Sequence, residues 1–114
     1  SFTEVYFAKS IGDKKVKLNL PQAIYVHPAL NALGTKVLVS SNKDDAHNFE
    51  VYAFDIATEC LERLTYNSSQ DLKPNWMDDE SKISFISDRN GKNQGYLMNY
   101  VPYKTCPNAL KAIK

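Results

Sequence analysis

The sequence predicts an all-β fold made of four-stranded antiparallel blades, and three observations support this prediction. First, the chain repeats at an interval of 46 residues, so that Glu4-Val5-Tyr6 recurs as Glu50-Val51-Tyr52. Second, each repeat contains short segments with alternating apolar and polar residues, the pattern of half-buried strands. Third, Asn90-Gly91 separates two such segments, and Asn-Gly favours a tight hairpin because both central residues adopt positive φ. A repeat of about 40 to 50 residues built from short strands is typical of β-propeller blades.

Further residues keep the same interval along the whole chain. They include apolar, turn and sulfur-bearing residues, which indicates that the repeat covers strands and connections alike. The matched sets are Leu18, Leu64 and Leu110; Pro28 and Pro74; Lys36 and Lys82; Ser41 and Ser87; and Cys60 and Cys106.

The strands of each unit follow in a constant order. In the second full unit we expect strands over 71–77, 82–87 and 94–99, with the polar residues 78–81 forming a turn. A fourth strand is expected near 104–111, although Pro102 and Pro107 weaken it because proline cannot donate to a strand ladder. The first full unit repeats this order over 23–30, 34–41, 50–55 and 60–65, and its hairpin at 43–48 is two residues longer.

Two further strands precede these units, over 4–8 and 14–20, and match the third and fourth strands of a blade. The expected organisation is therefore half a blade over 1–20, a full blade over 21–66 and a full blade over 67–114, or about two and a half blades of a partial propeller. Closed propellers contain about 4–8 blades, each burying its faces against neighbours. We therefore expect the chain to be a segment of a longer propeller or part of an assembly that supplies the rest. A self-contained small β-domain of degenerate blades is the alternative.

Composition excludes several classes of protein. The chain of 114 residues is 43% hydrophobic and 24% charged, which is ordinary for a globular domain and argues against disorder. No stretch approaches the roughly 20 apolar residues needed to span a bilayer. The first residues lack the basic and apolar regions of a signal peptide. A net charge of +1 gives no reason to expect nucleic acid as a partner.

Residues 63–99 resemble the repeat of TolB-type β-propellers. The run that carries the resemblance contains Arg63-Leu64-Thr65, Asp71, Pro74, Trp76, Ser87-Asp88-Arg89, Gly91 and Tyr96. The first full unit is a looser match, with Asn42-Lys43 in place of Asp88-Arg89, and Asp78-Asp79-Glu80 replaces the turn that is usual in the family. The resemblance implies a propeller that acts as a docking platform of the bacterial cell envelope. Similar repeats also occur in envelope proteins with peptidoglycan-binding domains, in propellers that gate serine peptidases and in some polysaccharide lyases.

Candidate binding residues lie in the turns and hairpins: Lys43, Asp44, Asp78, Asp79, Arg89 and Asn90. Asp88 and Arg89 could form a surface ion pair that contacts a ligand, but Asp88 is more simply explained as an acceptor for turn amides. Asp71 is expected to hold the loop between blades. The three carboxylates at 78–80 could attract a divalent cation through oxygen ligands, yet they lack the spacing of a calcium loop and favour a solvated turn.

Five other residues are of types that often carry function: one tryptophan, two histidines and two cysteines. Trp76 is expected in the core rather than as a ligand platform. His27 could face the central channel, where related lyases hold a metal, but neither it nor His47 has the spacing of a metal site. Cys60 and Cys106 occupy equivalent positions on successive outer strands, which should lie further apart than the ~7 Å limit for a disulfide. The sequence therefore predicts free thiols or bridges outside the chain, which argues mildly against an oxidising periplasm.

The predicted fold favours a non-catalytic protein–protein interaction scaffold, and the resemblance implies that it is periplasmic or associated with the cell envelope. Its expected partners are envelope proteins or the rest of the propeller, without nucleic acid and without direct membrane insertion. No catalytic residue, cofactor or metal is expected, since the sequence has no nucleophile elbow, zinc helix or phosphate loop. The alternatives are an auxiliary propeller segment of a larger serine peptidase or polysaccharide lyase, and a structural subunit of a large envelope machine.

Overall fold

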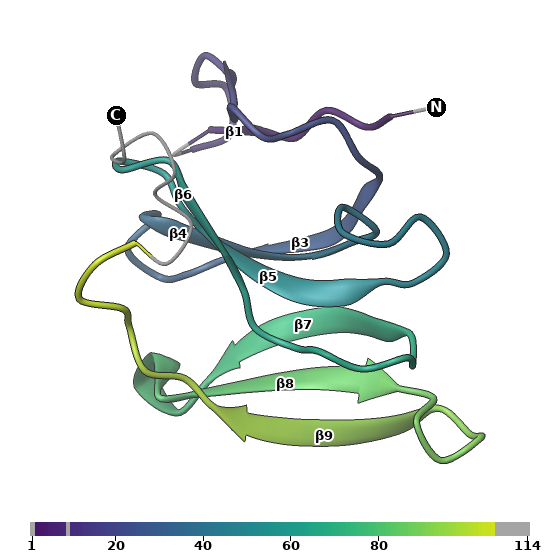
Figure 1. Ribbon diagram of the computed structural model, residues 1–114. Helices are drawn as coiled ribbons and strands as arrows, with labels where there is room; N and C mark the ends of the chain where they lie inside the picture. The colour runs from purple at the N-terminus through teal and green to yellow at the C-terminus, as the bar shows by residue number, and fades with distance from the viewer. Residues whose placement is uncertain (1, 9, 107–114) are drawn as a thin grey trace.

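The computed structural model describes residues 2–8 and 10–106 and contains three antiparallel sheets stacked on one another (Figure 1). The N-terminal pair is formed by β1 (Tyr6–Phe7) and β2 (Val16–Lys17). The central sheet has the order β3-β4-β5-β6, with β3 (Tyr25–Leu30), β4 (Lys36–Ser41), β5 (Glu50–Asp55) and β6 (Cys60–Arg63). The C-terminal sheet has the order β7-β8-β9, with β7 (Asp71–Met77), β8 (Lys82–Ser87) and β9 (Gln94–Asn99), and the turn η1 (Asp78–Glu80) joins its first two strands. The predicted all-β class with blade-like sheets is confirmed.

Burial shows which sheet faces are covered. Every residue from Val37 to Ser41 and from Glu50 to Phe54 is buried, because the central sheet has a neighbour on each face. In β8 buried and half-buried residues alternate, as expected for a strand covered mainly on one face. Two apolar clusters fill the spaces between sheets, one around Val39, Tyr52 and Phe54, and the other around Leu38, Val51, Ile83 and Phe85.

The repeat extends to irregular details of the backbone. His27 and Lys73 lie 46 positions apart, and each adopts a left-handed conformation, with φ of 55° and 53°. Both stand at a shift of register between the first two strands of their sheets, immediately before Pro28 and Pro74. Such a bulge leaves residues unpaired on one strand and increases its twist. The same bulge therefore occurs in the first strand of both sheets.

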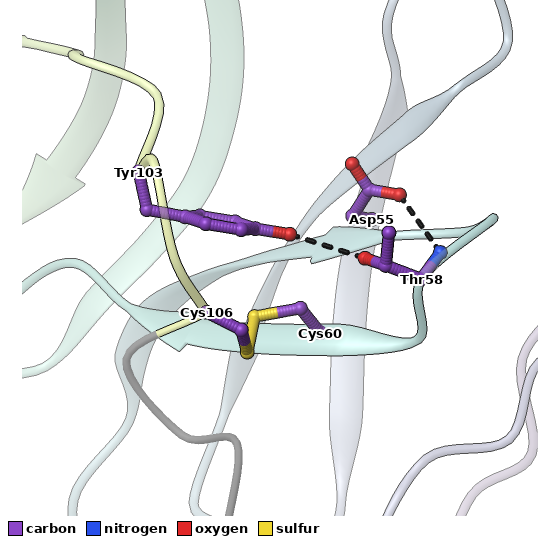
Figure 2. Close-up of a disulfide and its surroundings, with 5 residues drawn as sticks. All are labelled: Asp55, Thr58, Cys60, Tyr103 and Cys106. Atoms are coloured by element: carbon purple, nitrogen blue, oxygen red, sulfur yellow. Dashed lines mark hydrogen bonds between the residues drawn. A yellow bond between two sulfur atoms is a disulfide. The ribbon is translucent and has the colours of Figure 1, made fainter. Parts of the chain in front are cut away.

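The cysteine prediction is wrong: Cys60 and Cys106 form a disulfide, with their Cα atoms 5.9 Å apart (Figure 2). The prediction assumed that Cys106 lies on a fourth strand beside β9. Instead, the segment after β9 leaves its own sheet and runs to the central sheet, where the Tyr103 hydroxyl lies 3.1 Å from Thr58 Oγ1. Because the two cysteines are paired, they give no argument against an oxidising compartment.

The expected fourth strand of the last unit is also absent between 104 and 106, and residues 107–111 lie outside the described part of the chain. The equivalent turn of the central sheet contains a hydrogen bond that this segment cannot make. Between β5 and β6 the Thr58 amide donates to Asp55 Oδ1 at 3.1 Å and closes the turn. When β9 is aligned with β5 through their pairing with β8 and β4, Pro102 takes the place of Thr58. Because proline has no amide hydrogen, this turn-closing bond cannot form.

Candidate functional site

The six candidate binding residues lie at two opposite ends of the sheets. Lys43 and Asp44 follow β4, and Arg89 and Asn90 follow β8, so these four residues share what we call the hairpin end. Asp78 and Asp79 lie on η1 between β7 and β8, at the opposite end, which we call the acidic end. Figure 1 shows the β8–β9 hairpin and η1 on opposite sides of the C-terminal sheet. The sequence placed all six in turns but did not show that they belong to two separate surfaces.

At the hairpin end, repeat-equivalent residues make equivalent internal bonds. Asn42 Oδ1 accepts from the Ile24 amide at 2.9 Å, and Asp88 Oδ1 accepts from the Gln70 amide at 2.8 Å. The amides of Lys43 and Arg89 donate to the hydroxyls of Ser41 and Ser87, at 3.1 and 3.2 Å. Asp88 is therefore an acceptor for a loop amide, the simpler of its two explanations. The difference between Asn42-Lys43 and Asp88-Arg89 leaves the local geometry unchanged.

Glu50 is the centre of a buried polar network at this end. Its side chain is 2% exposed and accepts from Arg63 at 2.9 Å, from the Thr65 hydroxyl at 2.9 Å and from the Asn67 amide at 2.7 Å. Burial raises the pKa of Glu50, and the neighbouring Asp71 carboxyl adds to the effect, while these donors oppose it. Sequence reasoning assigned Glu50 no role. The available signal was the 46-residue repeat, which matches Glu50 with Glu4.

Asp71 joins the same network from the C-terminal sheet. It is fully buried and accepts from Asn67 Nδ2 at 2.9 Å and from Arg89 at 3.2 Å. Burial opposes its ionisation, but hydrogen bonds from Asn67, Ser87 and Thr65 outweigh this and lower the pKa of Asp71 below 3.8. The Arg89 guanidinium also lies 4.9 Å from the Tyr96 ring. Asp71 thus ties the loop between sheets to Arg89, and the Arg89 charge is used internally.

This pKa shift gives a test by pH. A carboxyl whose pKa is lowered on folding contributes stability above its unfolded value and loses it as pH falls through the folded value. We expect the difference in unfolding free energy between the native protein and Asp71→Asn to be largest near neutral pH and to shrink as pH falls through the acid range, where first the unfolded and then the folded carboxyl takes up a proton. Urea unfolding of both proteins from neutral to acid pH measures the difference. A constant difference through the acid range would contradict an ionised Asp71.

The other three residues of the hairpin end also have internal partners. Asp44 pairs with Lys43 at 3.0 Å and accepts from the Tyr52 hydroxyl at 2.7 Å. These bonds, together with the charges of Lys43 and Arg63, lower the pKa of Asp44 despite its partial burial. Asn90 Nδ2 donates to the Tyr96 hydroxyl at 2.9 Å. The charged groups at the hairpin end are therefore engaged in contacts within the protein that stabilise the hairpins.

The acidic end has a different character. Asp78, Asp79 and Glu80 all adopt positive φ, between 50° and 71°, which turns the backbone sharply between β7 and β8. Asn31 donates to Glu80 at 3.2 Å, whereas the Asp78 and Asp79 side chains have no bonding partner among the described residues and are exposed. Beside them lies a hollow of about 370 Å³ lined by Leu30, Asn31, Ala32, Asn75, Trp76, Met77 and the three carboxylates. A hollow with mixed apolar and polar walls and a rim of carboxylates can hold an apolar side chain flanked by positive charge.

Trp76 forms the wall of this hollow. Its indole Nε1 donates to the Ala29 carbonyl at 3.0 Å, and its ring meets Tyr100 edge-on with centroids 5.4 Å apart. These contacts agree with the packing role predicted for Trp76, although it is only half-buried. His27 is exposed on β3, and the described residues contain no group of three or more His, Cys, Asp or Glu placed to hold a metal. The same residues include no helix long and apolar enough to cross a membrane.

Comparison with solved structures identifies the fold. A protein assigned as TolB from Agrobacterium tumefaciens superposes with a TM-score of 0.68 at 23% identity over 84% of this chain. TolB from Acinetobacter baumannii superposes with a TM-score of 0.64 at 20% identity over 82% of the chain. The chain has a TolB-type propeller fold. It spans 34% and 25% of the length of these two structures, which accords with a partial propeller. No family model matches the sequence.

Proposed function

We propose that this TolB-type segment is a non-catalytic scaffold that binds protein partners in the cell envelope, and that the acidic end is its binding surface. The observation that carries the proposal is the contrast between the two ends. Lys43, Asp44 and Arg89 are held in internal bonds, whereas the Asp78 and Asp79 side chains have no partner within the described parts of the chain and lie beside a hollow in which Leu30 and Met77 are 43% and 40% exposed. The partner that fits is an extended segment with a basic residue next to an apolar one.

The disulfide supports the proposed compartment. Disulfides persist in secreted and periplasmic proteins and are rare in reducing cytosol. The Cys60–Cys106 bond is therefore compatible with the envelope location that the TolB-type fold suggests. The activity and partners of any longer protein that contains this segment belong to the same proposal.

Neutralising the acidic end tests the binding surface. Displayed random peptides are selected on the full chain, and the affinities of those enriched are measured by fluorescence anisotropy at low and high salt. We expect basic residues next to an aliphatic or aromatic one, and affinity that weakens roughly tenfold in Asp78→Asn/Asp79→Asn because two attractive charges are lost. The matched control is Asp13→Asn/Glu59→Gln, which removes the same charge from exposed positions elsewhere. Equal weakening by the control, or enriched peptides without basic residues, would reject the acidic end.

A further inference from the structure

β9 presents an open edge along the C-terminal sheet. It pairs only with β8 among the described strands, whereas the equivalent β5 lies between β4 and β6. The Tyr100 amide donates to the Ser81 carbonyl on the β8 side. Because backbone groups alternate in direction along an antiparallel strand, the amides and carbonyls of Gly95, Leu97 and Asn99 point away from β8. These three residues therefore offer a row of hydrogen-bonding groups to a further strand.

The central sheet shows what covers the equivalent edge. There the Leu64 amide donates to the Val51 carbonyl at 2.8 Å, and the Val51 amide donates to Thr65 Oγ1 at 2.9 Å. β6 runs antiparallel to β5, with Leu61 opposite Phe54. The side chain of Leu61 is 7% exposed and packs in the cluster that contains Leu18, Tyr52 and Phe54. One leucine of the covering strand thus anchors the outer part of the sheet.

In the C-terminal sheet the corresponding place is a hollow of about 290 Å³, which we call the β9 hollow. Its wall includes Leu64, Tyr96 and Met98, which are the repeat equivalents of Leu18, Tyr52 and Phe54. The remaining lining residues are Thr65, Tyr66, Asn67, Phe85, Arg89 and Leu97. The hollow therefore has the walls of the Leu61 site without its leucine.

The described chain does not supply the missing strand. Its continuation from 101 to 106 is held on the central sheet by the Tyr103–Thr58 contact and the Cys60–Cys106 disulfide. The edge and the hollow together have the features of a strand-addition site, in which main-chain bonds give affinity and a pocket for alternate side chains gives specificity. We propose that β9 binds an extended segment of a partner protein, antiparallel to β9, with a leucine-sized aliphatic side chain in the β9 hollow. The site uses neither Asp78 nor Asp79 and stands independently of the acidic end.

The probe is a synthetic peptide with the sequence of residues 57–66 carrying Cys60→Ser, because this segment covers the equivalent edge in the central sheet. Amide hydrogen exchange of the full chain is followed by NMR with and without the peptide. We expect saturable binding that slows exchange at Leu97 and Asn99 by about tenfold or more at saturating peptide. The amides of Tyr96 and Met98, which face β8, serve as internal controls and should change little.

Two matched comparisons isolate the strand-addition geometry. Leu97→Pro removes an amide hydrogen that faces the open edge, where proline is tolerated, and should abolish binding, whereas Leu97→Ala keeps the amide and should bind. A peptide that also carries Leu61→Ala should bind at least about tenfold more weakly, because it leaves the hollow empty. Binding that survives Leu97→Pro, or no saturation at millimolar peptide, overturns the proposal. Slow exchange at Leu97 and Asn99 without peptide also overturns it, since the chain or a second copy would then cover the edge.

Discussion

Replacing Cys60 and Cys106 together is expected to lower the free energy of unfolding by roughly 4 kcal/mol, because a disulfide that closes a loop of this length removes much of the entropy of the unfolded chain. The two residues are separated by 46 positions, and the bond joins β6 to the segment that follows the last strand. Without it, the contacts that hold the described part of this segment on the central sheet are between side chains, such as that between Tyr103 and Thr58. We therefore expect a large fall in the urea midpoint and in Tm for Cys60→Ala/Cys106→Ala.

Thiol labelling measures the bond directly. Under denaturing conditions the native protein should take up a thiol reagent only after reduction, and reduced protein should match the double variant in stability. Alanine is the suitable replacement because Cys60 is 3% exposed and a polar substitute would be buried there. Labelling without reductant would show that the disulfide is not formed. A variant as stable as the oxidised protein would show that the disulfide does not stabilise the fold.

The wrong cysteine prediction shows which structural features are determined by residues that are close in the sequence. The bounds expected for β5, β7, β8 and β9 agree with the structure, because alternation and turn residues act within a few positions of each strand. The path of the chain after Tyr100 depends instead on whether a turn closes and on what the segment meets afterwards. Pro102 was recognised as a weakening residue, but its consequence required the alignment with Thr58 in the folded sheets.

The candidate site was predictable to a similar extent. Turn chemistry placed the six binding candidates correctly at the ends of strands, yet whether a charged side chain is free or bonded depends on tertiary contacts. Arg89, for example, reaches Asp71 from eighteen positions away. Glu50 and Arg63 could have been found by extending the repeat, since they match Glu4 and Lys17, which also form an ion pair at 3.0 Å. Their burial follows from sheet stacking, which the sequence interval alone does not give.

The pairs Glu4–Lys17 and Glu50–Arg63 make the second large prediction unusually well controlled. Both join repeat-equivalent positions at nearly the same distance, 3.0 and 2.9 Å, but the Glu4 side chain is 57% exposed and that of Glu50 is 2% exposed. Water can solvate either member of the exposed pair when the other is removed, so the pair adds little to stability. Removal of Glu50 instead leaves the Arg63 guanidinium, the Thr65 hydroxyl and the Asn67 amide without their shared acceptor.

We accordingly expect Glu50→Ala to lower the free energy of unfolding by about 3–5 kcal/mol, the cost typical of breaking one side of a buried charged pair. Glu4→Ala should leave it unchanged within error. Urea unfolding at neutral pH compares the two variants, and circular dichroism of Glu50→Ala at low temperature verifies that it is folded before the transition. Equal effects of the two substitutions would mean that burial between the sheets does not decide the strength of this repeated ion pair. If the values separate as expected, the same two-residue motif contributes to stability only where a neighbouring sheet excludes water from it.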